Sequence, residues 1–270
     1  MTALSVEVDL SFIEQARGYI SSPSSTRLDK ILRHPAAKGV HSHAVRFCNT
    51  EKGLAGFWEE RLEGVTPDAV DMARANVGYM EENTVEFRAA FDELMGYVPK
   101  DLELRCRLYA VVGYDIGIVS DGDAYLNLAH SVYQDQRELV YFAMHELHHV
   151  AYTHYQPIYS FSDLKTTMDL RRVVMYSTHL EGLAVYAAYE KRRREDGLTH
   201  VDYRHYIDQS KRGRVIEEYF NIWDDLRSRP ERSFREDDFD ILERLSGERL
   251  WYVAGLHMAL TVDERLGEKG

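Results

Sequence analysis

The sequence predicts an α+β fold that is mainly helical, with a small antiparallel sheet packed on one histidine-bearing helix and on a following helix that carries a glutamate. Two observations lead to this prediction. Apolar residues recur at helical spacing through most of the 270 residues, whereas three short strand-like segments lie together between residues 102 and 128. A hydrophobic content of 44% is enough to bury a substantial core.

Helical patterns dominate the first hundred residues. Thr66 is a typical helix N-cap, Pro67 suits the first helical turn, and an apolar stripe continues from Val70 to Leu94 and ends near Gly96. We interpret this stripe as core. The histidines that precede it are expected to lie in a surface loop; they are His34, His41 and His43.

The predicted sheet comprises three segments. Residues 102–112, 116–119 and 124–128 have strand-like composition, and turns are expected at 113–115 and 121–123. If the segment 124–128 is an exposed edge, an extended peptide could bind to it as an added strand.

Helical patterns resume at Gln134. The sequence predicts a helix through the run 145–149, a long helix over 161–194, and further helices over 202–227, 237–245 and 249–266.

The run 145–149 contains the pattern H-E-x-x-H. Residues four apart lie on one face of a helix, so His145 and His149 can offer two nitrogens to one metal ion. Glu146 would then lie beside the ion and could take a proton from a metal-bound water. A purely structural histidine cluster is the alternative interpretation. His148 would face away from the pair and pack nearby or support a ligand.

Catalytic zinc usually has three protein ligands, so one more is needed. The short spacing of the metzincin pattern is absent, because Tyr152 and Tyr155 stand where it has Gly and His. About thirty residues downstream, Glu181 is followed by Gly182, which would let its helix approach the histidine helix closely. His179 is expected to be structural or to line a pocket.

These residues resemble the gluzincin metallopeptidases, which carry H-E-x-x-H on one helix and a Glu, often in an E-G-x-A-x-Y-like run, on the next. The resemblance implies that His145, His149 and Glu181 bind Zn²⁺ and that Glu146 is the general base. The chain also resembles, more loosely, uncharacterised predicted zinc-dependent proteases with a late Tyr-x-x-Gly-x-x-x-Ala segment, here 252–259. The resemblance covers about residues 120–260, and residues 1–100 resemble no family. Together with the helical patterns, it leads us to expect a helical N-terminal region over 1–100 and a zincin-like catalytic region over 101–270, forming one compact unit.

A hydrolase of this kind needs a donor for the oxyanion that develops during attack on a carbonyl, and Tyr O–H or His N–H can serve. Tyr252 and His257 flank Gly255, whose missing side chain suits a close helix contact. The sequence does not choose between them, and packing residues are an equal alternative.

We therefore expect a zinc-dependent hydrolase that cleaves a peptide or a small amide through a zinc-activated water. One alternative is a carboxylate-bridged di-iron protein, because Glu146 and His149 also spell Glu-x-x-His, but no second copy of that motif follows. The other is a non-catalytic metal-binding module, against which the intact Glu146 argues.

A formal charge of −12 disfavours general nucleic-acid binding, which needs a basic excess. The basic run 191–194 is expected to be a solvated helix end. Cys48 and Cys106 are too few for a disulfide scaffold. The start lacks the pattern of a signal peptide and no run is long enough to span a membrane, so we expect a cytoplasmic protein with no membrane partner. The oligomeric state is left open.

Overall fold

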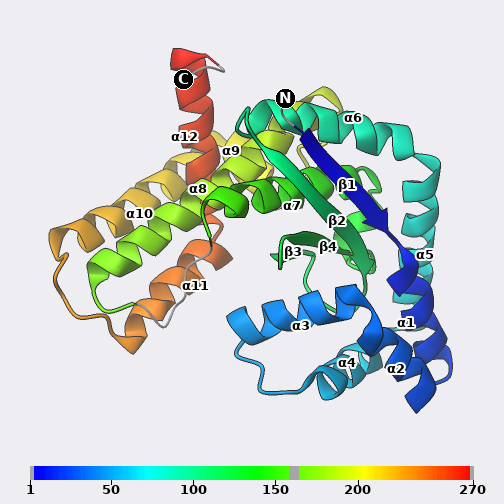
Figure 1. The fold of residues 1–270 in the computed structure, drawn as a ribbon. Coiled ribbons are helices and arrows are strands. Elements are labelled where there is room, and N and C mark those ends of the chain that lie inside the picture. The colour runs from blue at the N-terminus through cyan, green and yellow to red at the C-terminus, as the bar shows by residue number, and fades with distance from the viewer. Residues whose placement is uncertain (1–2, 158–163, 268–270) are drawn as a thin grey trace. The chain divides into compact units, whose positions relative to one another are not determined.

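The computed structural model describes residues 3–157 and 164–267 (Figure 1), and the chain forms two compact units, Met1–His154 and Tyr155–Gly270. Each unit is described by itself below. The fold is α+β and mainly helical, as predicted. Among the described residues, no helix combines the length and the apolar character that crossing a membrane requires. The expected division near residue 100, and the expectation of one compact unit, remain predictions.

The first unit holds a four-stranded sheet and the helices that precede and follow it. Its helices are α1 (Ser11–Ser21), α2 (Ser25–Arg33), α3 (Pro35–Phe47), α4 (Leu54–Glu63), α5 (Pro67–Glu82), α6 (Thr84–Leu94) and α7 (Arg137–Tyr155). Its strands are β1 (Ala3–Asp9), β2 (Glu103–Val111), β3 (Gly117–Ser120) and β4 (Asp123–Asn127).

The apolar stripe over 70–94 forms two helices instead of one. Thr66 caps α5 as predicted, its side chain accepting from the Ala69 N–H, but the chain leaves helical geometry at Asn83. Val85 follows this break and is 80% exposed, although it belongs to the stripe. Periodicity alone did not reveal the break, because both helices keep the same spacing.

The sheet is mixed, so the prediction of an antiparallel sheet was wrong. The strand order is β1-β2-β4-β3, with β1 and β4 both parallel to β2 and only β3 antiparallel to its neighbour. The N-terminal strand β1 was not expected within a helical region. Pairing of β1 with a strand a hundred residues away is a long-range contact that local patterns cannot indicate.

The predicted strands themselves are present, and a tight hairpin explains their order. Asp121 and Gly122 both have positive φ, 53° and 83°, as a two-residue turn between antiparallel strands requires. The hairpin returns β4 between β2 and β3. Residues 124–128 therefore form an interior strand, so the condition for a peptide to pair with this segment is not met; β3 is the terminal strand on that side.

The second unit is helical. It contains α8 (Thr167–Arg194), α9 (Val201–Ile207), α10 (Gln209–Ser228), α11 (Phe239–Gly247) and α12 (Leu250–Leu266). A capping box at Thr166 and Asp169 starts α8. The expected beginning of this helix at Phe161 lies outside the described residues. Asp208 separates α9 from α10 by capping α10, where the sequence suggested one helix.

Helices α8 and α12 cross at two glycines. A Cβ on Gly255 would lie 2.6 Å from the Cα of Gly182 and closer still to the Thr178 carbonyl oxygen. The close contact expected of Gly255 is thus confirmed. Gly182, however, faces α12, whereas the sequence had suggested an approach to the histidine helix. This crossing sets Glu181 and Tyr252 on neighbouring turns of the two helices.

Two predictions about charged and histidine-rich segments were wrong. The early histidines do not lie in a loop: His34 caps α3 and is 6% exposed, and His41 and His43 lie within α3. The run 191–194 is not wholly solvated either. Lys191 and Arg192 are buried, and Arg192 stacks on Tyr203 with its guanidinium carbon 4.6 Å from the ring centroid. Propensity identifies a helix end but not what packs on it.

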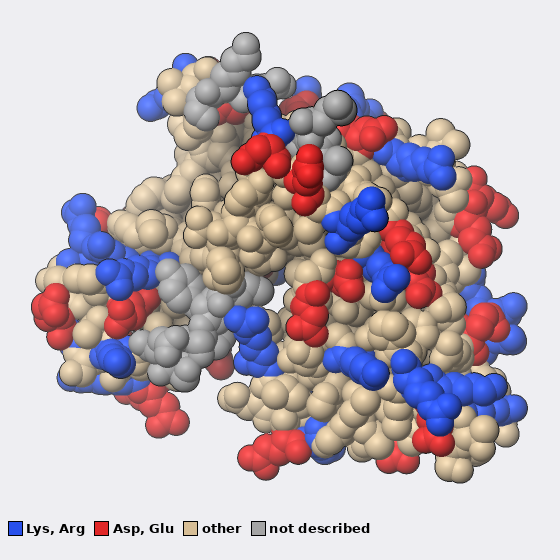
Figure 2. All heavy atoms as spheres, in the orientation of Figure 1, with Lys and Arg blue, Asp and Glu red and all other residues tan. Residues whose placement is uncertain are grey.

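Acidic and basic side chains are interspersed on the face drawn in Figure 2. The net charge is −12. The expectations about nucleic acid and oligomeric state remain predictions.

Candidate metal centre

Helix α7 places His145 and His149 on one face. The four-residue spacing brings their ring centroids to 4.4 Å at an interplanar angle of 80°. The helix is held in the core of the first unit by fully buried apolar residues on its other faces; they include Leu139, Val140, Ala143, Met144 and Leu147. The pair is therefore carried by a rigid element.

Glu146 is 4% exposed and lies against the start of β3. A Cβ on Gly117 would lie 2.8 Å from Glu146 Cδ and 2.9 Å from Cγ, and closer still to Oε1. Only glycine leaves room for this carboxylate beside the strand. Sequence reasoning did not single out Gly117. The available signal was a glycine at the start of a strand where no turn requires one, which suggests that another group packs closely against it.

In the second unit, Glu181 on α8 interacts electrostatically with Tyr252 and Arg249 near the start of α12. Burial raises the pKa of Tyr252 above its usual range, and the negative charge of Glu181 raises it further, whereas Arg249 opposes the shift. Tyr252 therefore stays protonated at physiological pH and can donate a hydrogen bond.

His257, the other candidate donor, has a different environment. Its ring centroid lies 6.3 Å from that of Tyr206, and its charged neighbours are Arg212 and Glu264. Burial lowers its pKa, and Arg212 contributes in the same direction. The two candidate donors therefore differ in their charged neighbours. Glu181 acts on Tyr252, whereas Arg212 and Glu264 act on His257.

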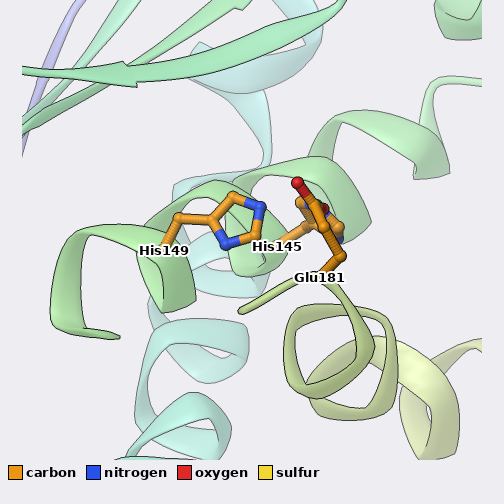
Figure 3. Close-up of side chains that lie close together, drawn as sticks. All are labelled: His145, His149 and Glu181. Atoms are coloured by element: carbon orange, nitrogen blue, oxygen red, sulfur yellow. The ribbon is translucent and has the colours of Figure 1, made fainter. Parts of the chain in front are cut away.

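His145, His149 and Glu181 each offer a ligand atom that lies within 4.8 Å of those of the other two (Figure 3). Ligands of a tetrahedral zinc ion lie about 3.4 Å apart, given bonds of about 2.1 Å. Two imidazoles and one carboxylate are also a donor set that zinc accepts while keeping a fourth position open.

The remaining histidines of the two motifs lie outside this group. His148 is 3% exposed, and its ring is roughly parallel to that of Tyr152 with centroids 6.3 Å apart. That contact agrees with the packing role expected for it. His179 is exposed on α8.

A second polar cluster in the first unit contains Ser11, His34 and Asp9. Ser11 Oγ lies 2.9 Å from His34 Nε2 and donates to Asp9 Oδ1 at 2.6 Å. However, His34 Nδ1 accepts the Ala36 N–H, so the neutral ring carries its proton on Nε2 and donates to Ser11. It cannot act as a base toward this serine, and the cluster is a helix cap.

A family model described as "Putative zinc dependent peptidase (DUF5700)" matches residues 71–270. The chain belongs to this family, which supports a zinc hydrolase at a coarse level. Neither the curated proteins nor the solved structures contain a significant match.

Proposed function

We propose that this protein is a gluzincin-like metallopeptidase that hydrolyses peptide or amide bonds, with His145, His149 and Glu181 as the zinc ligands. The observation that carries the proposal is the convergence of these three side chains, joined to membership of a zinc-dependent peptidase family. The zincin-like arrangement of the helices belongs to the same proposal.

Zinc, when bound, would supply Lewis acidity that polarises a carbonyl and lowers the pKa of water. Glu146 is the proposed general base: it accepts a proton from the attacking water and later returns it to the leaving amine. Its position supports this role, because its carboxylate is buried and lies against Gly117 at the start of β3.

Tyr252 is the proposed oxyanion donor. Its phenol is protonated at physiological pH, because burial and the negative charge of Glu181 both raise its pKa. His257 remains the second candidate, but its charged neighbours Arg212 and Glu264 favour a packing role. A phenol that donates to the developing oxyanion contributes about 10²- to 10³-fold to kcat in comparable sites.

The terminal strand β3 begins at Gly117, where Glu146 lies. We propose that an extended peptide pairs with β3 and so brings its carbonyl toward Glu146. Main-chain hydrogen bonds would then supply affinity with little sequence preference.

The two alternatives, a di-iron protein and a non-catalytic metal-binding module, are less well supported by the group of ligands. A di-iron centre needs four carboxylates and two histidines. Within residues 3–157 and 164–267, the metal-binding group found holds a single carboxylate. A non-catalytic module would bind zinc without turnover.

The test begins with a peptide-library screen of the zinc-loaded protein, with a chelator-treated sample as control. Glu146→Gln is expected to keep zinc and lower turnover at least about 100-fold, because the amide preserves shape but cannot take the proton. Glu138→Gln, a buried glutamate on the same helix, is the matched control.

Zinc content measured in parallel tests the ligands. Glu181→Ala is expected to weaken zinc retention at limiting concentration, and unchanged affinity would remove Glu181 from the ligand set. Undiminished turnover of zinc-loaded Glu146→Gln would contradict the role of the base. Zinc binding with no cleavage of any peptide would favour the non-catalytic module.

A further inference from the structure

We infer that Arg249, clamped by the buried carboxylate of Asp202, is a positioning residue that fixes the ring of Tyr252 and thereby aims its phenol. The inference rests on the proposed function in naming what Tyr252 does, but the clamp itself is a property of the second unit alone.

Arg249 and Asp202 form a bidentate ion pair. Arg249 Nε and Nη2 donate to Oδ1 and Oδ2 of Asp202 at 2.6 Å and 2.7 Å. Asp202 is 2% exposed, and His200 Nδ1 lies 3.2 Å from its Oδ2. Two planar groups joined by two parallel hydrogen bonds have one relative orientation, so the plane of the guanidinium is fixed.

The fixed guanidinium lies on the face of Tyr252. Its central carbon is 3.3 Å from the ring centroid. For comparison, the guanidinium carbon of Arg192 in the same unit lies 4.6 Å from the ring centroid of Tyr203. A planar cation stacked at this distance restricts the tilt of the ring, and its charge makes the phenol a better hydrogen-bond donor.

Arg249 also has an unusual backbone conformation. Arg249 has φ 60° and ψ 26°, the left-handed conformation that non-glycine residues rarely adopt, directly before α12. An ordinary helix N-cap would be Ser, Thr, Asp or Asn in extended geometry. The surrounding contacts therefore hold an unfavourable conformation whose effect is to turn the side chain of Arg249 back over its own helix.

Tyr252 also packs against an apolar cluster that contains Val185, Tyr203 and Leu256, and Trp251 lies beside it, but none of these side chains is a planar cation. The crossing of Gly182 and Gly255 places the start of α12 beside α8, but it does not set the rotation of a ring three residues earlier. Glu181, a proposed zinc ligand, is also among the charges that act on Arg249. The clamp thus places one cation where it can influence both Tyr252 and Glu181.

The first experiment uses metal-free protein, so it does not depend on activity. With ¹³C-labelled tyrosine, the Tyr252 resonances are assigned by their loss in Tyr252→Phe. In Arg249→Lys a cation still faces Asp202, but lysine has no planar group to stack on the ring and cannot form two parallel hydrogen bonds. We therefore expect the Tyr252 signals to shift and broaden. Arg232→Lys is the matched control, because Arg232 forms a similar bidentate pair with Asp238 in the same unit.

Unchanged Tyr252 signals in folded Arg249→Lys would overturn the inference. If Arg249→Lys does not fold, Asp202→Asn loosens the same clamp while keeping its shape, and its Tyr252 signals decide the matter in the same way.

The second experiment is a double-mutant cycle on the zinc-loaded enzyme. Arg249→Lys should lower kcat about tenfold or more in the wild-type background, with a smaller change in KM. In the Tyr252→Phe background it should change kcat less than about twofold, because the hydroxyl through which it acts is absent. Equal losses in both backgrounds would show that Arg249 does not act through Tyr252. If the Tyr252 signals broaden in Arg249→Lys but the wild-type protein hydrolyses no peptide, the result supports the positioning role of Arg249 and refutes only the proposed function.

Discussion

Gly117→Ala separates the position of Glu146 from its chemistry. The new Cβ would lie 2.8 Å from Glu146 Cδ and 2.9 Å from Cγ. Carbon atoms in contact lie at about 3.5–4.0 Å, so the carboxyl carbon must move by about 0.7 Å or more. The obstructed atoms are the end of a flexible side chain, which can rotate away. Gly117 has no positive φ, so alanine fits its backbone.

The expected result is a folded, zinc-binding protein with an intact but displaced base. A displacement approaching 1 Å lowers a rate by roughly 100-fold, so kcat/KM should fall by about that factor. The melting temperature should change little, because replacing glycine with alanine at a permitted conformation also restricts the unfolded chain.

The assay is chelator-sensitive peptide hydrolysis, with zinc content and thermal unfolding measured on the same samples. Gly78→Ala is the matched control, since a Cβ there meets no atom within 4 Å. Activity within twofold of wild type in a folded Gly117→Ala protein would refute the reasoning, because the carboxylate would then tolerate the displacement that the geometry imposes.

Two further predictions concern packing and substrate. Gly255→Ala should lower the free energy of unfolding by about 1–3 kcal/mol in urea denaturation, because the new Cβ meets backbone atoms of α8 that cannot rotate away. Gly213→Ala is the control, because a Cβ there meets no atom within 4 Å. Equal stability of the two variants would contradict the prediction. A peptide-like inhibitor should protect the amides of β3 from hydrogen exchange and leave those of β4 unchanged, since β4 is already paired on both sides. Protection confined to the helices would instead favour a compact, non-peptide substrate.

Local patterns were sufficient for most elements and for the chemistry-bearing residues. The spacing of His145 and His149 needs only the pitch of one helix, so the sequence indicated their shared face correctly. The turn at Asp121 and Gly122 and the cap at Thr66 likewise depend on near neighbours. Such features are set by interactions within a few residues, which a sequence displays directly.

The order of strands and the surroundings of the site were decided by tertiary structure. β1 pairs with β2 across a hundred residues, and β4 inserts between β2 and β3, so the sequence mispredicted a wholly antiparallel sheet and could not identify the edge strand. Nothing in the sequence marks Gly117 as the neighbour of Glu146, or Arg249 as the partner of Asp202.

The physical reason is that a residue's type limits the contacts it can make, whereas the chain's long-range packing selects the partner. The sequence by itself determined that two imidazoles share a helix face with a carboxylate beside them. Only the tertiary structure decided which glycine makes room for that carboxylate and which arginine, paired with a buried aspartate, stacks on Tyr252.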